Sequence, residues 1–337
     1  MKKLIVTVAL STVGMLCAFA QTPTASQNFA DHPRAYTHRY SFWSEFNMSG
    51  SIDSAQRWQY QIDYQYRRMS DASYIVVGDH GNIFKNPSQQ VLRPWIHYWI
   101  IPKKLRFSLS PLGYWITWTP PQEGAVYPTS QGNQGATVYP EFRICPQITV
   151  NSQLGRLQFV NRYRYEFRYV GNREQSTTFA EDLGKGYSFY PNPIGQGYGS
   201  NHLGRFRWQI RAQLLLNSPK MRKNSIYLNM WNELFIGIGK HINYSKMLNQ
   251  NRTVAMIGWK LPTQYPVRLE AGVTLQTNFL YNIGTVPTQP NVTYNKQNVE
   301  LNTAYTIYII FDEFHTIFKG KGKKAKQDEP MFPHPQK

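Results

Sequence analysis

Strict alternation of polar and apolar residues is the feature that most constrains the fold of this chain. In RYRYEFRY (162–169), three arginines and Glu166 fall on one side of an extended chain and four aromatic rings fall on the other. This follows because successive side chains in a strand point to opposite faces. The same pattern recurs in RWQYQIDYQYR (57–67), RFRWQIRAQLLL (205–216) and VRLEAGVTLQTNF (267–279). Such alternation predicts long strands, each with one polar and one apolar face.

Eleven stretches of this kind are separated by connections of two sorts. The expected strands cover residues 36–52, 57–70, 89–101, 104–118, 138–152, 155–171, 203–217, 224–239, 251–261, 265–281 and 297–312. Tight turns such as DSAQ, PKK, SQLG, SPKMRK and PTQ alternate with long connections at 71–88, 119–137, 172–202, 240–250 and 282–296. Short turns at one end and long loops at the other are typical of an outer-membrane barrel. A soluble sandwich is the alternative, but it gives no reason for this alternation and needs a second sheet to bury the aromatic faces.

The predicted fold is therefore all-β: a transmembrane, antiparallel, up-and-down barrel over residues 36–318, with short periplasmic turns and long extracellular loops. Strands survive in a bilayer only in a closed barrel, which pairs every backbone polar group. Bacterial single-chain barrels generally have an even number of strands. We therefore expect about twelve, with residues 21–35 supplying an extra strand or threading through the lumen. Pro111 and Gly113 predict a bulge in the fourth strand.

The ends of the chain indicate export. Lys2 and Lys3, the apolar run LIVTVALSTVGML and the small residues Ala18–Ala20 predict a signal peptide over residues 1–20. Its removal would leave Cys145 as the single cysteine, so no intramolecular disulfide is expected. We therefore expect the outer membrane of a Gram-negative bacterium as the location.

Several strand patterns carry a family resemblance. YSFWSEFNMSGSI, RWQYQIDYQYRR, RPWIHYWI and FSLSPLGYWITWTP resemble a family of Bacteroidetes-type outer-membrane barrels catalogued as domain of unknown function 2490. The resemblance covers residues from about 36 to 314. It implies a barrel and no particular activity, because its motifs are strand patterns without catalytic signatures.

The formal net charge of +18 makes acidic partners the natural expectation. The predicted inward-facing basic cluster contains Arg162, Arg164, Arg168, Arg205, Arg207 and Arg211, and the predicted inward acids include Glu141, Glu166, Glu233 and Glu270. This face has two interpretations: a cationic lumen that admits or binds anions, or a lumen filled by arginine–carboxylate and tyrosine hydrogen bonds. Twelve strands lie between the filled barrels of about eight and the channels of about sixteen, and the filled network is the preferred interpretation of the arginines.

The opposite face is expected to contact lipid. Its representatives are Tyr163, Tyr165, Trp208, Leu214 and Leu275, the two leucines being expected near mid-strand. Nucleic acid is not expected as a partner, because RYRYEFRY separates its rings from its cations and a nucleic-acid platform needs both on one surface. The expected partners are outer-membrane lipids and lipopolysaccharide. The basic tail at 319–337, which contains KGKGKKAK, could also contact other outer-membrane or periplasmic proteins.

Motifs for metal, nucleotide or nucleophilic chemistry are absent: the sequence has no HExxH, no paired CxxC and no GxxxxGK[ST]. No cofactor and no metal site are therefore expected. The sequence favours a non-enzymatic barrel, either a narrow passage or binding barrel for small anionic solutes or a subunit of a larger outer-membrane assembly. The alternative is a lipid-modifying enzyme, an acyl hydrolase or transferase, which needs an accessible serine–histidine pair. His97, between Trp95 and Trp99, is interpreted instead as an interface or lumen residue.

Overall fold

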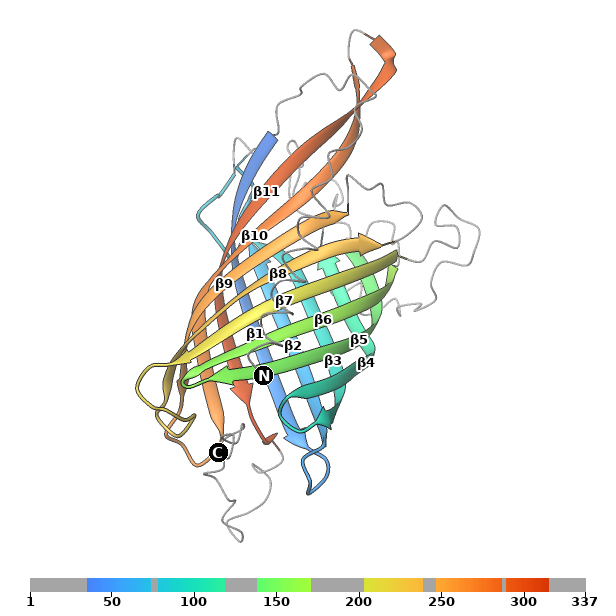
Figure 1. Cartoon of the computed structure of the whole chain (residues 1–337). Helices are drawn as coiled ribbons and strands as arrows, with labels where there is room; N and C mark the ends of the chain where they lie inside the picture. The colour runs from blue at the N-terminus through green and yellow to red at the C-terminus, as the bar shows by residue number, and fades with distance from the viewer. Residues whose placement is uncertain are drawn as a thin grey trace, which may run out of the picture. The chain divides into compact units, whose positions relative to one another are not determined.

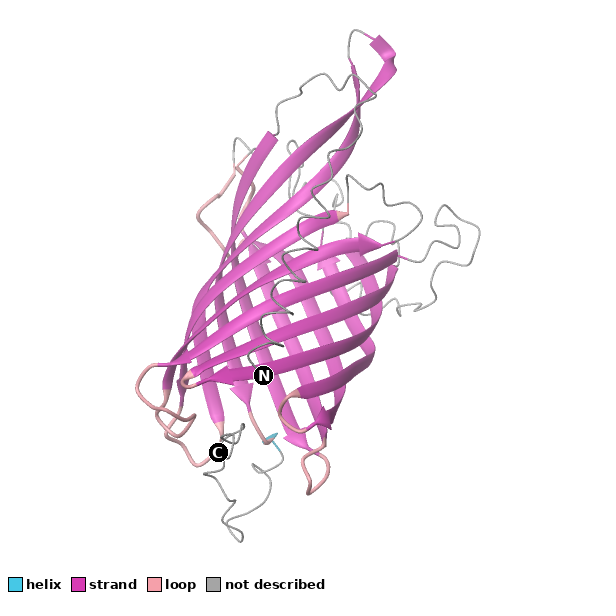
Figure 2. Ribbon diagram, viewed as in Figure 1, coloured by secondary structure: helices cyan, strands magenta, loops and turns pink. Residues whose placement is uncertain are grey.

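The computed structural model describes residues 35–73, 78–118, 138–170, 203–238, 247–286 and 289–314. They form eleven strands, one for each strand predicted from the sequence (Figures 1 and 2). The strands are β1 (Ala35–Ser51), β2 (Trp58–Met69), β3 (Asn86–Ile101), β4 (Leu105–Trp118), β5 (Val138–Leu154), β6 (Leu157–Val170), β7 (Leu203–Leu215), β8 (Ile226–Ile238), β9 (Leu248–Lys260), β10 (Val267–Val286) and β11 (Gln289–Phe311). The signal peptide at 1–20, most of the segment at 21–35 and the tail at 319–337 lie outside the described residues.

The strands close into a barrel in sequence order. From β1 to β10 each strand pairs antiparallel with its sequence neighbour, and β11 lies between β10 and β1. The pairing of β1 with β11 is parallel and runs from Ala35↔Asn298 to Met48↔Phe311. An odd number of up-and-down strands requires this, because the first and last strands then point the same way.

The expectation of about twelve strands is therefore corrected to eleven for the described residues. The parallel pairing gives β1 and β11 partners on both sides, so neither offers an open edge to a further strand. The fifth long connection, predicted at 282–296, is also wrong, because β10 extends to Val286 and β11 begins at Gln289. Residues such as Val292, Thr293 and Tyr294 favour the extended chain. The segment Ile283–Lys296 belongs to a compact unit separate from the barrel.

The five tight connections predicted from the sequence all lie at one end of the barrel, which we call the short-turn end. Gly155, between β5 and β6, has a φ of 58°, a left-handed conformation that glycine adopts without strain. The opposite end, the long-loop end, carries the β2–β3 connection. The predicted loops at 119–137 and 172–202 lie outside the described residues, as do residues 240–246 of the loop predicted at 240–250, whose last residues belong to β9. The predicted bulge in β4 is confirmed by a register shift between Ser110 and Gly113.

The barrel is polar inside and apolar outside. On β10, Thr274 and Gln276 are 0% and 8% exposed, whereas Leu275 between them is 54% exposed. Alternation of this kind puts one face of each strand in the interior. The described residues contain no helix with the length and apolar character needed to cross a membrane.

Side chains fill the half of the interior nearer the short-turn end. Ser108, Tyr227, Thr274 and Thr306, from four different strands, are all fully buried there. The Tyr227 ring lies over Gly258 of β9, where a Cβ atom would come within 2.2 Å of it. Only glycine therefore permits this packing. The remaining space lies nearer the long-loop end.

Candidate functional site

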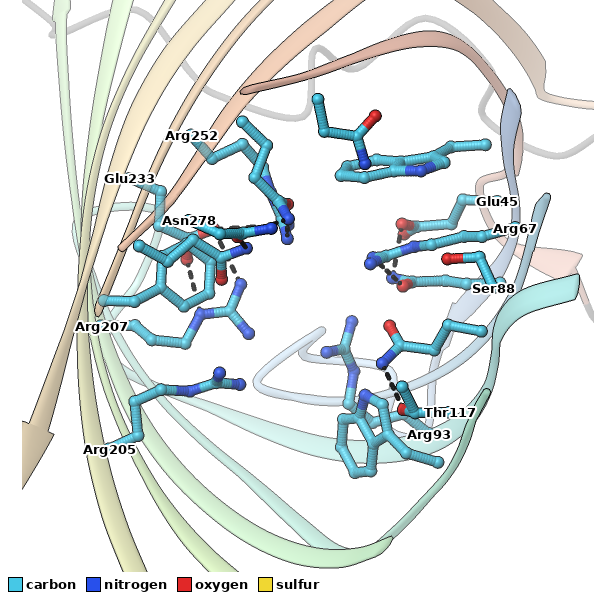
Figure 3. Close-up of a pocket in the computed structure, with 18 of the residues that line it drawn as sticks. Glu45, Arg67, Ser88, Arg93, Thr117, Arg205, Arg207, Glu233, Arg252 and Asn278 are labelled. Atoms are coloured by element: carbon cyan, nitrogen blue, oxygen red, sulfur yellow. Dashed lines mark hydrogen bonds and ion pairs between the residues drawn. The ribbon is translucent and has the colours of Figure 1, made fainter. Parts of the chain in front are cut away.

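The remaining interior space is a cavity of about 480 Å³ (Figure 3). Gln89 of β3, Thr117 of β4 and Arg168 of β6 line it close to the long-loop ends of their strands. Ten arginines and four glutamates line the wall, with no lysine or aspartate among the described lining residues. The cavity is therefore strongly cationic.

The structure brings all six arginines of the predicted basic cluster to this cavity, and four further arginines join them. The predicted members are Arg162, Arg164, Arg168, Arg205, Arg207 and Arg211, and the additional ones are Arg67, Arg93, Arg143 and Arg252. The six predicted arginines lie in two adjacent rows, three on β6 and three on β7. Arg164 is paired in register with Arg207, and Glu166 with Arg205.

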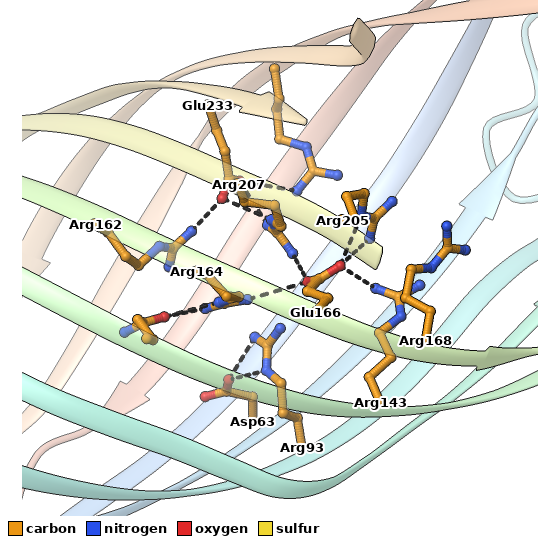
Figure 4. Close-up of polar contacts among 12 residues, drawn as sticks. Asp63, Arg93, Arg143, Arg162, Arg164, Glu166, Arg168, Arg205, Arg207 and Glu233 are labelled. Carbon is orange, nitrogen blue, oxygen red and sulfur yellow. Dashed lines mark hydrogen bonds and ion pairs between the residues drawn. The ribbon is translucent and has the colours of Figure 1, made fainter. Parts of the chain in front are cut away.

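Glu166 is the centre of the ion-pair network (Figure 4). Its carboxylate is fully buried and accepts hydrogen bonds from Arg205 at 2.8 and 2.6 Å, from Arg207 at 2.7 Å and from Arg143 at 3.3 Å. Charge-assisted bonds of this length are the strong ones. One carboxylate therefore holds three guanidinium groups from two strands, β5 and β7.

Two further carboxylates extend the network. Glu233 of β8 accepts from Arg207 at 2.9 and 2.7 Å and from Arg162 at 2.7 Å. Glu141 of β5 accepts from Arg143 at 2.7 Å and also from Arg168. These acids separate guanidinium groups that would otherwise repel one another.

Glu270, the fourth predicted inward acid, does not reach the cavity. It lies in the filled half of the barrel, where it accepts from the Tyr227 hydroxyl at 2.8 Å and from the Asn229 amide at 3.1 Å. It is inward-facing but belongs to the packed interior.

Several arginines are held by rings and amides instead of carboxylates. Arg164 is 3% exposed, donates to the Gln147 amide oxygen at 2.9 and 2.8 Å, and lies 4.6 Å from the Trp95 ring centroid. Its Nη1 has no hydrogen-bond partner, and the nearest Glu166 oxygen is 3.9 Å away. Arg211 similarly lies 5.1 Å from the Trp231 ring, with its Nε unpaired. Each of these two groups therefore has one buried N–H donor without a protein acceptor.

Inward-facing rings are the part of the site that alternation missed. Trp43, Trp95, Trp115, Trp231 and Phe235 all point into the barrel and are buried there. Arg93 was missed because two of the other three residues of its inward row in RPWIHYWI are tryptophans, so the row appears apolar. Arg252 was missed because TVAMIGWKL has little polar alternation. Both arginines lie beside a ring on another strand, Arg93 at 5.9 Å from the Trp115 centroid and Arg252 at 4.9 Å from the Trp43 centroid, and these contacts become visible only in the folded barrel.

The separation of rings from cations seen in RYRYEFRY therefore holds within that strand and not across the whole interior. The interior rings are covered by arginines, as where Arg143 lies 4.0 Å from the Trp115 centroid. A covered ring face has no room for a stacked base.

The five residues predicted to face lipid lie on the outward side of their strands. Leu275 and Leu214 are 54% and 38% exposed, and Tyr163, Tyr165 and Trp208 are partly exposed. Leu275 is near the middle of β10, but Leu214 is the next-to-last residue of β7, beside the short-turn end. The mid-strand expectation for Leu214 is therefore wrong.

A serine–histidine contact occurs in the filled half of the interior. His97 Nδ1 lies 2.7 Å from Ser108 Oγ, and His97 Nε2 lies 3.2 Å from the Gln61 amide oxygen. Both His97 and Ser108 are buried, and neither lines the cavity. The pair has an amide where a catalytic triad has a carboxylate. Within the described part of the chain, no group of three or more His, Cys, Asp or Glu side chains is placed to hold a metal ion.

Comparison with known proteins identifies a family. The family model described as protein of unknown function (DUF2490) matches residues 40–285, which span β1 to most of β10. The chain belongs to this family. No curated protein and no solved structure matches the chain. The description of DUF2490 names no activity, so the function of this member rests on the geometry of its barrel.

Proposed function

We propose that this DUF2490 protein is a non-enzymatic outer-membrane barrel whose interior cavity binds small anionic solutes. The observation that carries the proposal is the charge of the cavity wall. Ten arginines face four glutamates, an excess of six positive charges. Glu166 and Asp63 do not line the cavity, but both form ion pairs with arginines that do. If these two carboxylates are counted as well, an excess of four positive charges remains.

An outer-membrane location is supported by the distribution of polarity. Outward side chains such as Ile96, Leu275 and Tyr305 are between 45% and 54% exposed, while charged groups are buried inside. In water this arrangement would expose a large apolar surface, whereas in a bilayer the same surface faces lipid. Tyr163, Tyr165, Trp208, Leu214 and Leu275 are assigned to this lipid contact. Outer-membrane lipids and lipopolysaccharide are accordingly the proposed surroundings.

Binding is favoured over passage because one half of the interior is filled. Thr274 and Thr306 bond to each other at 2.9 Å, and Ser108, His97 and Tyr227 are buried in the same half of the barrel. A water-filled passage would leave such side chains partly exposed. The cavity is therefore proposed to be closed toward the short-turn end.

An enzymatic role in lipid modification has one supporting observation, the contact between His97 and Ser108. Because both side chains are buried inside the barrel, lipid acyl chains at the outer face cannot reach them. The proposed function therefore contains no catalytic step.

The test combines calorimetry with conductance, using the full chain purified in detergent. Inorganic phosphate titrated into the protein should bind at one site per chain, whereas choline at equal ionic strength should give no binding. The variant Arg156→Gln, at an exposed arginine in the β5–β6 turn, is the matched control and should bind phosphate like the wild type. The same protein in planar bilayers should conduct little current. Absence of phosphate binding would overturn the binding role, and a large, steady, ion-selective current would favour passage instead.

A further inference from the structure

Two arginines in the cavity lie beside one tryptophan ring. The guanidinium carbon of Arg67, on β2, is 4.2 Å from the Trp43 ring centroid, and that of Arg252, on β9, is 4.9 Å from it. Their separation therefore cannot exceed the sum of those two distances. Strands β10, β11 and β1 lie between β9 and β2 in the wall, so the chain brings two distant arginines together.

These two arginines keep most of their charge unneutralised. Arg67 donates to the Gln65 amide oxygen at 2.8 Å, and no carboxylate of the described residues forms an ion pair with it. Arg252 donates to the Gln276 amide oxygen at 3.1 and 2.8 Å. Its nearest carboxylate oxygen, on Glu233, is 4.0 Å away and already accepts from Arg207.

Both arginines are held in place by contacts that leave their charge free. Arg252 also lies 5.0 Å from the Phe235 ring, which has Arg207 at 4.3 Å and Arg205 at 5.1 Å. An arc of alternating guanidinium groups and rings thus runs from β7 through β8, β9 and β1 to β2. Ring contacts orient a guanidinium group without neutralising it, so its donors remain available.

The positive groups face one another across the cavity. Figure 3 shows Arg67 and Arg93 on one side and Arg205, Arg207 and Arg252 on the facing side, with open space between them. Like charges facing each other in a protein interior repel strongly, because screening there is weak. An anion that reaches both sides removes this repulsion.

From this geometry, and resting on the proposed anion-binding function, we infer that the cavity takes a free solute with two or more oxyanion groups. These groups are phosphate, sulfate or carboxylate, and the solute bridges β2 and β9 through Arg67 and Arg252. The forked donors of arginine match such planar or tetrahedral oxyanions, which chloride cannot mimic.

The excess of at least four positive charges in the cavity is more than one monovalent anion neutralises. A volume of about 480 Å³ suits a small organic ligand. A free solute is assigned because the closed wall separates the cavity from surrounding lipid.

The test compares anions of different valence on the full chain. Pyrophosphate should bind at least ten-fold more tightly than acetate at equal ionic strength by calorimetry. The double variant Arg67→Gln/Arg252→Gln should lose at least ten-fold in pyrophosphate affinity, and Arg156→Gln should lose none. The variant Arg67→Lys/Arg252→Lys keeps the positive charges without the forked guanidinium donors, so its pyrophosphate affinity should lie between those of the wild type and the double glutamine variant. It also provides a second test if the double glutamine variant folds poorly. Retained heat-modifiable gel mobility checks that each barrel is folded.

The outcomes separate the two proposals. If no anion binds the wild type, the proposed function itself fails. If acetate and pyrophosphate bind with equal affinity, or if neither double variant weakens the binding of pyrophosphate, the anion-binding function stands and the polyvalent ligand is rejected.

A last experiment places the barrel in phosphatidylcholine nanodiscs with and without lipopolysaccharide. Unchanged pyrophosphate affinity supports a free solute, whereas competition by lipopolysaccharide would overturn that assignment in favour of lipid phosphate groups.

Discussion

At the scale of single residues, the interior arginines are of two kinds. Arg207 donates to Glu166 and Glu233, both buried, and so joins the two carboxylates in one ion-pair network. Arg67 bonds to an amide and stacks on a ring. Removing an arginine of the first kind takes one charged partner from each buried carboxylate that it joins, whereas removing one of the second kind relieves repulsion between cations.

Arg207→Gln should therefore destabilise the barrel by about 3–5 kcal/mol, the usual cost of breaking a buried ion pair from one side. Arg67→Gln should cost less, because it orphans no carboxylate. Urea-induced unfolding in lipid vesicles, followed by tryptophan fluorescence, measures both. Equal costs for the two variants would contradict the division into two kinds.

Outward leucines at different heights make a second comparison. Leu275→Arg, near the middle of β10, should cost about 2–4 kcal/mol if that position lies at the bilayer midplane, whereas Leu214→Arg, beside the short-turn end, should cost about 0–1 kcal/mol. The same unfolding experiment measures them, with the barrel in vesicles. A larger cost for Leu214→Arg would show that the strands sit at another depth.

Outside the strands, Asp71 anchors the β2–β3 connection. It is buried, which alone would raise its pKa, but bonds from Lys85, Asn86 and the Asp79 backbone NH hold the pKa below its usual value of 3.8. A carboxylate whose pKa is lower in the folded than in the unfolded state stabilises the folded protein at pH values above the unfolded-state pKa. This stabilisation is lost as the pH falls through the folded-state pKa. Asp71→Asn should therefore be less stable than wild type at pH 7, with the difference shrinking below about pH 3.8. Unfolding midpoints across this range check it, and a difference that grows on acidification would contradict it.

At the scale of strands, alternation predicted where each element lies and which face is polar. RYRYEFRY became β6, with Arg164 and Glu166 buried and Tyr169 37% exposed. The pairing of charges could not be read in the same way, because Glu166 meets arginines of β5 and β7 whose register depends on the turns. Aromatic residues were the other difficulty, because the sequence does not distinguish an inward-facing tryptophan such as Trp95 from an outward-facing one. Arg164 lies over the Trp95 ring only because the curvature of the barrel brings their strands together.

The parallel pairing of β1 with β11 was not predicted from the sequence, because an even number of strands was expected. The register places Ser44 opposite Ile307, both on the outward face. Ser44→Cys/Ile307→Cys should form a disulfide on mild oxidation, detected as faster mobility on a non-reducing gel. The control is Ser44→Cys/Leu301→Cys, on the same face but six residues away along β11, about 20 Å, and it should not cross-link. A twelfth strand between β1 and β11 would abolish the first cross-link.

At the scale of the whole molecule, the barrel has two different ends. Tight turns join strands at one end, and long connections such as the one between β6 and β7 join them at the other. Outer-membrane barrels place short turns in the periplasm. An epitope inserted between residues 172 and 202 should therefore be labelled on intact cells, and an epitope after residue 330 should be labelled only after permeabilisation. Surface labelling of the C-terminal epitope alone would reverse the orientation.

The parallel contact between β1 and β11 also sets the order of folding. Ser41 and Asn302, 261 residues apart in the chain, share a hydrogen bond of 2.7 Å across it. All other pairings join strands that follow one another, so they close shorter loops at smaller entropic cost, whereas this contact must bring together the two ends of the strand series. Until it forms, β1 and β11 each present an unpaired edge, the kind of surface on which chains aggregate. Barrel closure is therefore expected to be the slow step in refolding, and the interval before it is the period in which assembly is most vulnerable.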